Sequence, residues 1–202
     1  MKLLILDTET LGLYDQRVYN LGYLIYDTET KTTIKARDYV IKEIYDNNRL
    51  MQTAYYYDKK PLYEMRIANG TCKKINWTYA LRVLAREIKK YNVATMYAFN
   101  SRFDIKSIEK TCNYYHTKNP ATEISDIWKG QANPKITTQQ AYIDFCKNNG
   151  FMTKHKKPRP RENAQTLYAY ITNNPNYVEE HTALEDSKIE LEILKTALGL
   201  LE

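Results

Sequence analysis

Residues 2–9 read Lys-Leu-Leu-Ile-Leu-Asp-Thr-Glu, an apolar run that ends in two acidic residues. The run predicts a buried strand over 2–6. Because side chains alternate along a strand, Asp7 and Glu9 are expected to project from one face at its end. Two carboxylates this close repel each other unless a proton or a cation lies between them, and hard divalent cations prefer carboxylate oxygens. The pair is therefore a candidate metal site, although the pattern Asp-x-Glu alone is common.

The tetrapeptide Asp-Thr-Glu-Thr occurs twice, at 7–10 and at 27–30. If the first two strands are antiparallel neighbours, Asp7 and Asp27 lie at opposite edges of the sheet. Asp27 then belongs to a hairpin turn, where Asp and Thr are common. We therefore assign the candidate chemistry to Asp7 and a structural role to Asp27.

The rest of the chain predicts an α/β fold. Strands over 18–26 and 32–41 form an antiparallel three-strand meander with the first strand, and alternating helices and strands follow. Helical spacing of apolar residues, turn residues and short apolar runs predict helices over 77–88, 103–114, 137–149, 163–172 and 183–200, and strands over 93–99 and 123–128. Strands first and then alternating elements indicate one mixed sheet, with parallel strands beside the meander, flanked by helices.

Length and composition indicate a single domain over 1–202, because 202 residues are enough for one substantial core and no long linker interrupts them. No apolar run approaches the ~20 residues of a membrane helix, and residues 1–7 turn acidic too soon for a signal peptide. Three cysteines form an odd set without a CxxC pair, which excludes a disulfide framework and suggests a reducing cytosol. We expect a cytoplasmic protein with no membrane partner.

Two further motifs follow predicted strands or begin predicted helices. The first is Asn100-Ser101-Arg102-Phe103-Asp104, and the second is His181-x-Ala183-x-x-Asp186. Judged alone, each could be a helix start, with Asn100 as a cap and Asp104 favoured by the helix dipole. His181 is expected at the mouth of the last helix, where the dipole discourages its protonation. All three motifs in this order arise by chance in roughly one chain in several thousand.

The three motifs together resemble those of the DEDDh 3′–5′ exonucleases, which include the proofreading subunit of the bacterial replicative polymerase. The stretch from Arg161 to Asp186 is also similar to freestanding exonucleases of bacteriophages and their Gram-positive hosts. The resemblance spans nearly the whole chain and implies a ribonuclease-H-like fold. A histidine five residues before the last aspartate matches this branch, whereas the sister branch has a tyrosine closer to that aspartate.

The resemblance implies a role for each motif residue. Asp7, Glu9, Asp104 and Asp186 would hold two Mg²⁺ or Mn²⁺ ions, and His181 would accept the proton of the attacking water. Glu9 and the backbone from Thr10 through Leu11 and Gly12 to Leu13 would grip the terminal sugar. Asn100 and Phe103 would shape the site.

Binding of nucleic acid is expected from charge and aromatic residues. The formal net charge is +6, and residues 154–161 carry five positive charges without an acidic residue. Lys156, Lys157, Arg159 and Arg161 are candidate phosphate contacts, and the tyrosines at 55–57 are candidate base-stacking residues. A solvated loop and structural tyrosines are the alternative interpretations. Residues 48–70 and 150–162 are expected on the substrate side, and His116 and His155 are expected at the surface.

These inferences predict an enzyme that removes nucleoside 5′-monophosphates from the 3′ end of single-stranded or frayed DNA. The first alternative is a 3′–5′ exonuclease acting on RNA or short oligonucleotides, because the motifs read phosphate and metal rather than the sugar 2′-hydroxyl. The second is a nucleic-acid-binding replication accessory protein. Any polymerase or other replication partner would act in trans, in a bacterial or phage-infected cytosol.

Overall fold

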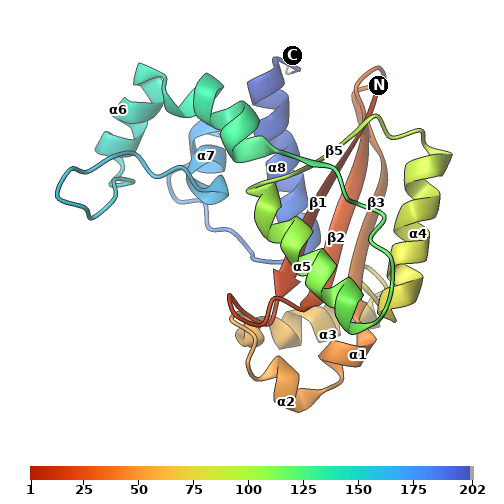
Figure 1. Ribbon diagram of the computed structural model, residues 1–202. Coiled ribbons are helices and arrows are strands. Elements are labelled where there is room, and N and C mark those ends of the chain that lie inside the picture. The colour runs from red at the N-terminus through yellow and green to blue at the C-terminus, as the bar shows by residue number, and fades with distance from the viewer. Residues whose placement is uncertain (201–202) are drawn as a thin grey trace.

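The computed structural model describes residues 1–200, so residues 201–202 of the predicted domain lie outside the described part. A six-stranded sheet forms the centre, with helices on both faces (Figure 1). The strands are β1 (Lys2–Thr10), β2 (Val18–Asp27), β3 (Thr32–Ile41), β4 (Lys73–Ile75), β5 (Thr95–Ala98) and β6 (Ile124–Asp126). The helices are α1 (Lys42–Tyr45), α2 (Asn48–Met51), the 3₁₀ turn η1 (Tyr57–Lys59), α3 (Lys60–Ala68), α4 (Trp77–Lys90), α5 (Ser101–Tyr114), the π-helix η2 (Trp128–Thr137), α6 (Gln140–Asn148), α7 (Ala164–Ile171) and α8 (Ala183–Leu198).

The strand order is β4-β3-β2-β1-β5-β6. The first three strands pair antiparallel, while β5 runs parallel to β1, β6 parallel to β5, and β4 parallel to β3. This confirms the predicted mixed sheet, with a three-strand antiparallel meander and parallel additions. Parallel pairing brings the carboxyl ends of β1 and β5 to the same edge, where residues that follow them can meet.

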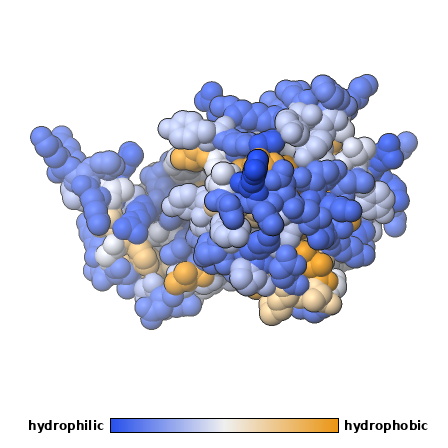
Figure 2. Space-filling view, turned by 90° about the horizontal axis from the view of Figure 1, so that it is seen from below, coloured by the Kyte–Doolittle hydropathy of each residue, from blue (hydrophilic) through white to orange (hydrophobic). Residues whose placement is uncertain are grey.

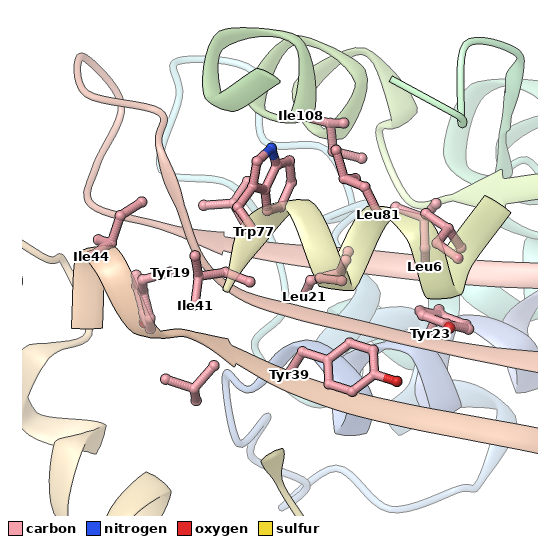
Figure 3. Packing of buried hydrophobic residues seen from close by; sticks show 14 of the residues in the cluster. Leu6, Tyr19, Leu21, Tyr23, Tyr39, Ile41, Ile44, Trp77, Leu81 and Ile108 are labelled. Carbon is pink, nitrogen blue, oxygen red and sulfur yellow. The ribbon is translucent and has the colours of Figure 1, made fainter. Parts of the chain in front are cut away.

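Each face of the sheet has its own hydrophobic core. One core joins the β-strands to α4 and α5, with Trp77 and Leu81 packed over the strands in Figure 3. The other joins them to η2, α6, α7 and α8. Alternation along β1 places Leu4 and Leu6 in the first core and Leu3 and Ile5 in the second. By the same alternation Asp7 and Glu9 face the side of the sheet that α8 covers.

The repeated tetrapeptide falls at the two edges that antiparallel pairing predicts. Asp27 lies opposite Lys2 in the register, at the start of β1, while Asp7 lies near its end. Asp27 Oδ2 is 3.3 Å from Lys2 Nζ, and its Oδ1 accepts a hydrogen bond from the backbone N–H of Glu29. Asp27 is therefore a turn residue, as predicted, and it also pairs with Lys2.

Several elements differ from the sequence-based prediction. The strand expected over 123–128 is shorter than predicted, since β6 spans only Ile124–Asp126. From Trp128 the chain continues as the π-helix η2, which contains Pro134. The expected helix over 137–149 begins later, as α6, and the last helix ends at Leu198 before Gly199, which has a φ of +67°. Residues 48–70 fold into α2, η1 and α3. The short elements α1 and β4 were not predicted, since they carry too few residues for a periodic pattern.

The surface seen from below in Figure 2 is mainly hydrophilic, with small separate hydrophobic patches, and the cysteines lie in the interior. None of the helices among residues 1–200 is long and apolar enough to cross a membrane. Cys72, Cys112 and Cys146 are buried and free. His116 and His155 are exposed, as predicted.

The first turn of α8 lies directly against β2. A Cβ atom added at Gly22 would lie 2.1 Å from the backbone nitrogen of Leu184 and 2.2 Å from the carbonyl carbon of Ala183. Two residues earlier, Asn20 Oδ1 accepts hydrogen bonds from Ala183 N–H at 2.9 Å and from the Tyr63 hydroxyl at 2.9 Å. In the register Gly22 is the partner of Asp7, so this close approach positions α8 beside the acidic end of β1.

Replacing Gly22 by alanine should therefore destabilise the protein strongly, because the clash is with backbone atoms that cannot rotate away. We expect a loss of about 3 kcal/mol or more, equivalent to a fall in Tm of roughly 6–12 °C. Gly130→Ala is the matched control, since a Cβ there meets nothing within 4 Å. Equal Tm values for the two variants in a thermal melt would contradict the close approach of α8.

Candidate active site

Three carboxylates come together where β1 and α8 meet. Asp7, Glu9 and Asp186 each offer an oxygen atom within 4.8 Å of the others. Asp7 and Glu9 lie on one face of β1 by strand alternation, and Asp186 lies in the first turn of α8. The sequence motifs at the two ends of the chain are thus brought into one site by the contact of α8 with β2.

Asp104 approaches the same place from α5. Its Oδ1 accepts two hydrogen bonds from Thr8, one from the backbone N–H at 3.1 Å and one from the hydroxyl at 2.8 Å. Thr8 stands between Asp7 and Glu9 in sequence, so the link ties the first turn of α5 to the acidic end of β1. Asp104 is buried and borders the same cavity, but it lies outside the tight group of three.

A cavity of about 520 Å³ opens over these carboxylates. Residues from β1 and the following loop, from the tyrosine segment, from the start of α5 and from α8 surround it. Its lining comprises Asp7, Thr8, Glu9, Thr10, Gly12, Leu13, Tyr55, Tyr56, Phe99, Asn100, Phe103, Asp104, Asn163, Ala164, Glu179, His181, Asp186 and Glu190. All four motif acids and the motif histidine therefore share one cavity.

Burial and mutual repulsion raise the pKa values of these acids. Burial, followed by repulsion from Glu179, raises the pKa of Asp186 to about 9 and that of Glu9 to about 8. Burial also raises the pKa of Asp7 well above its usual range, with Glu190 as the largest repulsive neighbour. Burial raises the pKa of Asp104 to about 7, although its hydrogen bonds from Thr8 work in the opposite direction.

Two buried oxygens in this cluster have no hydrogen-bond partner, Asp186 Oδ1 and Glu190 Oε2. Buried polar atoms without partners are rare in folded proteins and point to a missing ion or water. Because every donor in the group is a carboxylate oxygen, the site suits a hard divalent cation such as Mg²⁺ or Mn²⁺. The residues therefore fit the metal that the motifs imply.

Glu190 is a fifth acid that the motifs did not indicate. It is 3% exposed and lies four residues after Asp186, one turn further along α8. Helical spacing places residues i and i+4 on one face, so the signal was present in the sequence. The sequence alone does not single out Glu190, because glutamate at this position is equally typical of an exposed helix face.

His181 lies just before α8, with a left-handed backbone φ of +59°. Its ring stacks on Tyr56, with centroids 4.3 Å apart and planes 11° from parallel, and its Nδ1 is 3.8 Å from Glu179 Oε2. Burial, with a smaller contribution from Lys59, lowers the pKa of His181. The expected neutral histidine is therefore supported, but burial rather than the helix dipole is the main cause. The sequence did not indicate Glu179.

The other predicted substrate residues are divided among three places. Thr10, Gly12, Asn100 and Phe103 line the acidic cavity, whereas Leu11 is buried in the hydrophobic core and Leu13 lines the cavity instead. Arg159 and Arg161 line a neighbouring cavity, and the exposed Lys156 and Lys157 line neither. Asn100 precedes α5 with a φ of +58° and makes no side-chain cap, so the alternative interpretation of this residue as a helix cap is wrong. Tyr55 and Tyr56 reach the cavity, but Tyr57 does not.

The acidic cluster predicts how stability depends on pH. These carboxyl groups bind protons more tightly in the folded chain than in the unfolded chain, where their pKa values are near 4. The free energy of unfolding in EDTA should therefore fall as pH rises from about 4 to about 9. Urea unfolding at pH 5, 7 and 9 measures this fall.

Saturating Mn²⁺ should reduce that fall, because a cation binds the ionised carboxylates of the folded chain only. Stabilisation by Mn²⁺ should accordingly be larger at pH 8 than at pH 5. Asp7→Asn should lose most of it, while Asp27→Asn, at the other end of the sheet, should keep it. The same pH dependence with Mn²⁺ and with EDTA would contradict a metal site.

Comparison with known proteins supports the fold. No protein-family model and no curated protein matches the sequence. Among solved structures, the nuclease domain of 3′hExo, a DEDDh family member bound to rAMP, is similar with a TM-score of 0.57 and 11% identity over 98% of this chain and 92% of that chain. A full-length 3′-exonuclease is similar with a TM-score of 0.54 and 12% identity, over 98% of this chain and 60% of its own length.

Exonuclease I of E. coli in complex with a dA16 oligonucleotide gives a TM-score of 0.52 and 14% identity. The match covers 98% of this chain but 41% of that one, so this chain spans less than half of Exonuclease I. The fold that the resemblance implied is thus confirmed: the chain has a ribonuclease-H-like mixed α/β fold, which it shares with these exonucleases.

Proposed function

We propose that this protein is a metal-dependent 3′–5′ exonuclease that releases nucleoside 5′-monophosphates from single-stranded or frayed DNA. The observation that carries the proposal is the convergence of Asp7, Glu9 and Asp186 within 4.8 Å of one another, beside Asp104, in the cavity of an exonuclease fold. Fold alone does not fix function, but a cluster of buried carboxylates with unpartnered oxygens is a specific chemical feature.

Asp7, Glu9, Asp104 and Asp186 are the residues that would hold a pair of Mg²⁺ or Mn²⁺ ions. Bound there, the ions supply a more acidic water and stabilise negative charge on the departing 3′ oxygen. The fold of the protein holds these carboxylates in position. Asp7 and Glu9 are held by the pairing of β1 with β2, and Asp104 is held by its two hydrogen bonds from Thr8.

His181 is proposed as the group that accepts the proton of the attacking water. A neutral imidazole is required for this role, and burial, which lowers the pKa of His181, favours that neutral form. Stacking on Tyr56 limits rotation of the imidazole ring, and Glu179 lies near its Nδ1. Nε2 is then the nitrogen left to face the water.

The demand for a free 3′ end is proposed to come from Glu9 and the segment after β1. Thr10, Gly12 and Leu13 line the cavity next to the carboxylates, so a terminal sugar bound there would place its phosphodiester at the acidic group. RNA is a second candidate substrate, because the similar 3′hExo domain was solved with rAMP whereas Exonuclease I was solved with a DNA oligonucleotide.

A time course with 5′-labelled single-stranded DNA and the matching RNA tests the activity. With Mg²⁺ or Mn²⁺ we expect a ladder that shortens from the 3′ end, and in EDTA no shortening. Asp7→Ala should lower the rate at least about 1,000-fold, since it removes a central metal ligand. Asp27→Ala, which changes the same tetrapeptide at the other edge of the sheet, should keep the wild-type rate.

The faster of the two labelled strands identifies the preferred sugar. If neither strand shortens with either metal while the protein still binds the oligonucleotide, the protein is a binding accessory and the exonuclease proposal is wrong.

The Tyr56–His181 stack predicts a graded effect on the same reaction. Tyr56→Ala should lower kcat about 10-fold, because the imidazole loses the ring that orients it, whereas Tyr56→Phe should stay within about twofold. Tyr57→Ala is the control, since Tyr57 lies next in sequence but outside the cavity. Stabilisation by Mn²⁺ should be unchanged in all three variants. Equal rates for the alanine and phenylalanine variants of Tyr56 would show that stacking does not matter.

A further inference from the structure

A second cavity borders the acidic one. It has a volume of about 420 Å³ and is lined by Phe99, Asn100, Trp128, Thr153, Arg159, Pro160, Arg161, Glu162 and Asn163. Three of these residues, Phe99, Asn100 and Asn163, also line the acidic cavity. The two cavities therefore share a wall, and a strand whose end lies at the carboxylates could continue into the second. We call the second cavity the Trp128 groove.

Two aromatic rings give the groove flat apolar faces. Phe99 and Trp128 stack with centroids 6.3 Å apart and planes 17° from parallel, and both are half-buried. The Lys129 ammonium lies 5.1 Å from the centre of the Trp128 ring. A half-buried tryptophan that stacks on one neighbour and still lines a cavity can stack a further planar group, as a nucleobase is.

The position of Trp128 is fixed by polar contacts. Its indole Nε1–H donates to Glu162 Oε2 at 3.2 Å, and Asn133 Nδ2 donates to the same oxygen at 3.4 Å. Trp128 begins the π-helix η2, a rare element that is frequent at functional sites. The Glu162 carboxylate is thus engaged in holding the ring, and the groove keeps the ring in one orientation without a ligand.

Positive charge also lines the groove. Backbone hydrogen bonds hold the hairpin that carries Arg159 and Arg161, from Thr153 N–H to Arg159 O at 2.8 Å and from Arg161 N–H to Phe151 O at 2.9 Å. Both arginine residues are exposed, and neither forms a salt bridge within residues 1–200. Two unpaired guanidinium groups beside a stacking ring complement the phosphates and bases of a nucleic acid strand.

We propose that the Trp128 groove binds the part of a single-stranded nucleic acid that lies upstream of its 3′ end. One base stacks on Trp128, and the flanking phosphates contact Arg159 and Arg161. The inference rests on the proposed exonuclease function and extends it, since it assigns the path by which the strand leaves the acidic cavity. Stacking does not distinguish one base from another, so the groove accepts any sequence.

Tryptophan fluorescence provides a direct test. The chain has two tryptophans, and Trp77 is fully buried in the core, so a ligand in the groove should alter the emission of Trp128 alone. The probe is oligothymidine whose 3′-terminal linkages are phosphorothioates, added to the protein with Mg²⁺ so that binding is measured without turnover. We expect quenching that saturates with oligonucleotide, and no saturating quench in Trp128→Phe.

Affinity, measured by anisotropy of a labelled oligonucleotide, separates stacking from a general disturbance. Trp128→Ala should weaken binding about 10-fold, while Trp128→Phe, which keeps a ring, should stay within about threefold. The double variant Arg159→Ala/Arg161→Ala should reduce the slope of log affinity against log salt by about 1.4. Arg82→Ala/Arg86→Ala removes the same charge from the exposed side of α4 and should leave the slope unchanged.

The groove proposal is overturned if the oligonucleotide binds the wild-type protein without quenching, or if Trp128→Ala binds it as tightly as wild type. In that case metal-dependent shortening of DNA would persist, and the proposed function would stand. If the wild-type protein neither binds nor shortens the oligonucleotide, the exonuclease proposal itself fails and the groove proposal fails with it.

Discussion

The site depends on the contact between the first turn of α8 and the middle of β2. Gly22 leaves no side chain between the two backbones, and Asn20 supplies the hydrogen-bond acceptor that the first N–H of α8 needs. Because Gly22 is the register partner of Asp7, a helix that packs on Gly22 necessarily brings Asp186 to Asp7. The carboxylates are thus brought together by backbone packing at Gly22, although their mutual repulsion opposes this arrangement.

That opposition has a physical logic. Burying several carboxylates together costs stability, because burial disfavours their charged forms and each raises the pKa of its neighbours. The packing of two hydrophobic cores, one on each face of the sheet, offsets the cost. A divalent cation relieves the repulsion and satisfies the unpartnered oxygens, so binding of metal and stability of the fold are coupled. Glu190 adds to this cost, because it is as deeply buried as the motif acids. It is not one of the three carboxylates that lie within 4.8 Å of one another.

Local patterns in the sequence were sufficient for the framework. The apolar run before Asp7, the two strands that follow it and the spacing of apolar residues around Leu81 predicted the meander and α4, because alternation and helical period are local properties. Tyr56, Glu179 and Trp128 could not be assigned in this way. Each acquires its role from a residue distant in sequence, and Trp128 also lies in a π-helix, which has no periodic signature. Leu11 was predicted to contact the substrate through its backbone, and that prediction is compatible with the burial of its side chain in the core.

The duplicated tetrapeptide shows where the identity of a functional residue resides. Identical letters at 7–10 and 27–30 stand at the two ends of one hairpin, one copy holding the cavity and the other a turn. The tetrapeptide alone therefore does not show which of the two copies belongs to the candidate active site. The distinction comes from partners far along the chain, such as Asp104, which binds Thr8 although it lies 96 positions further on. In this protein the same four residues are catalytic candidates or turn residues according to the residues that the fold places around them.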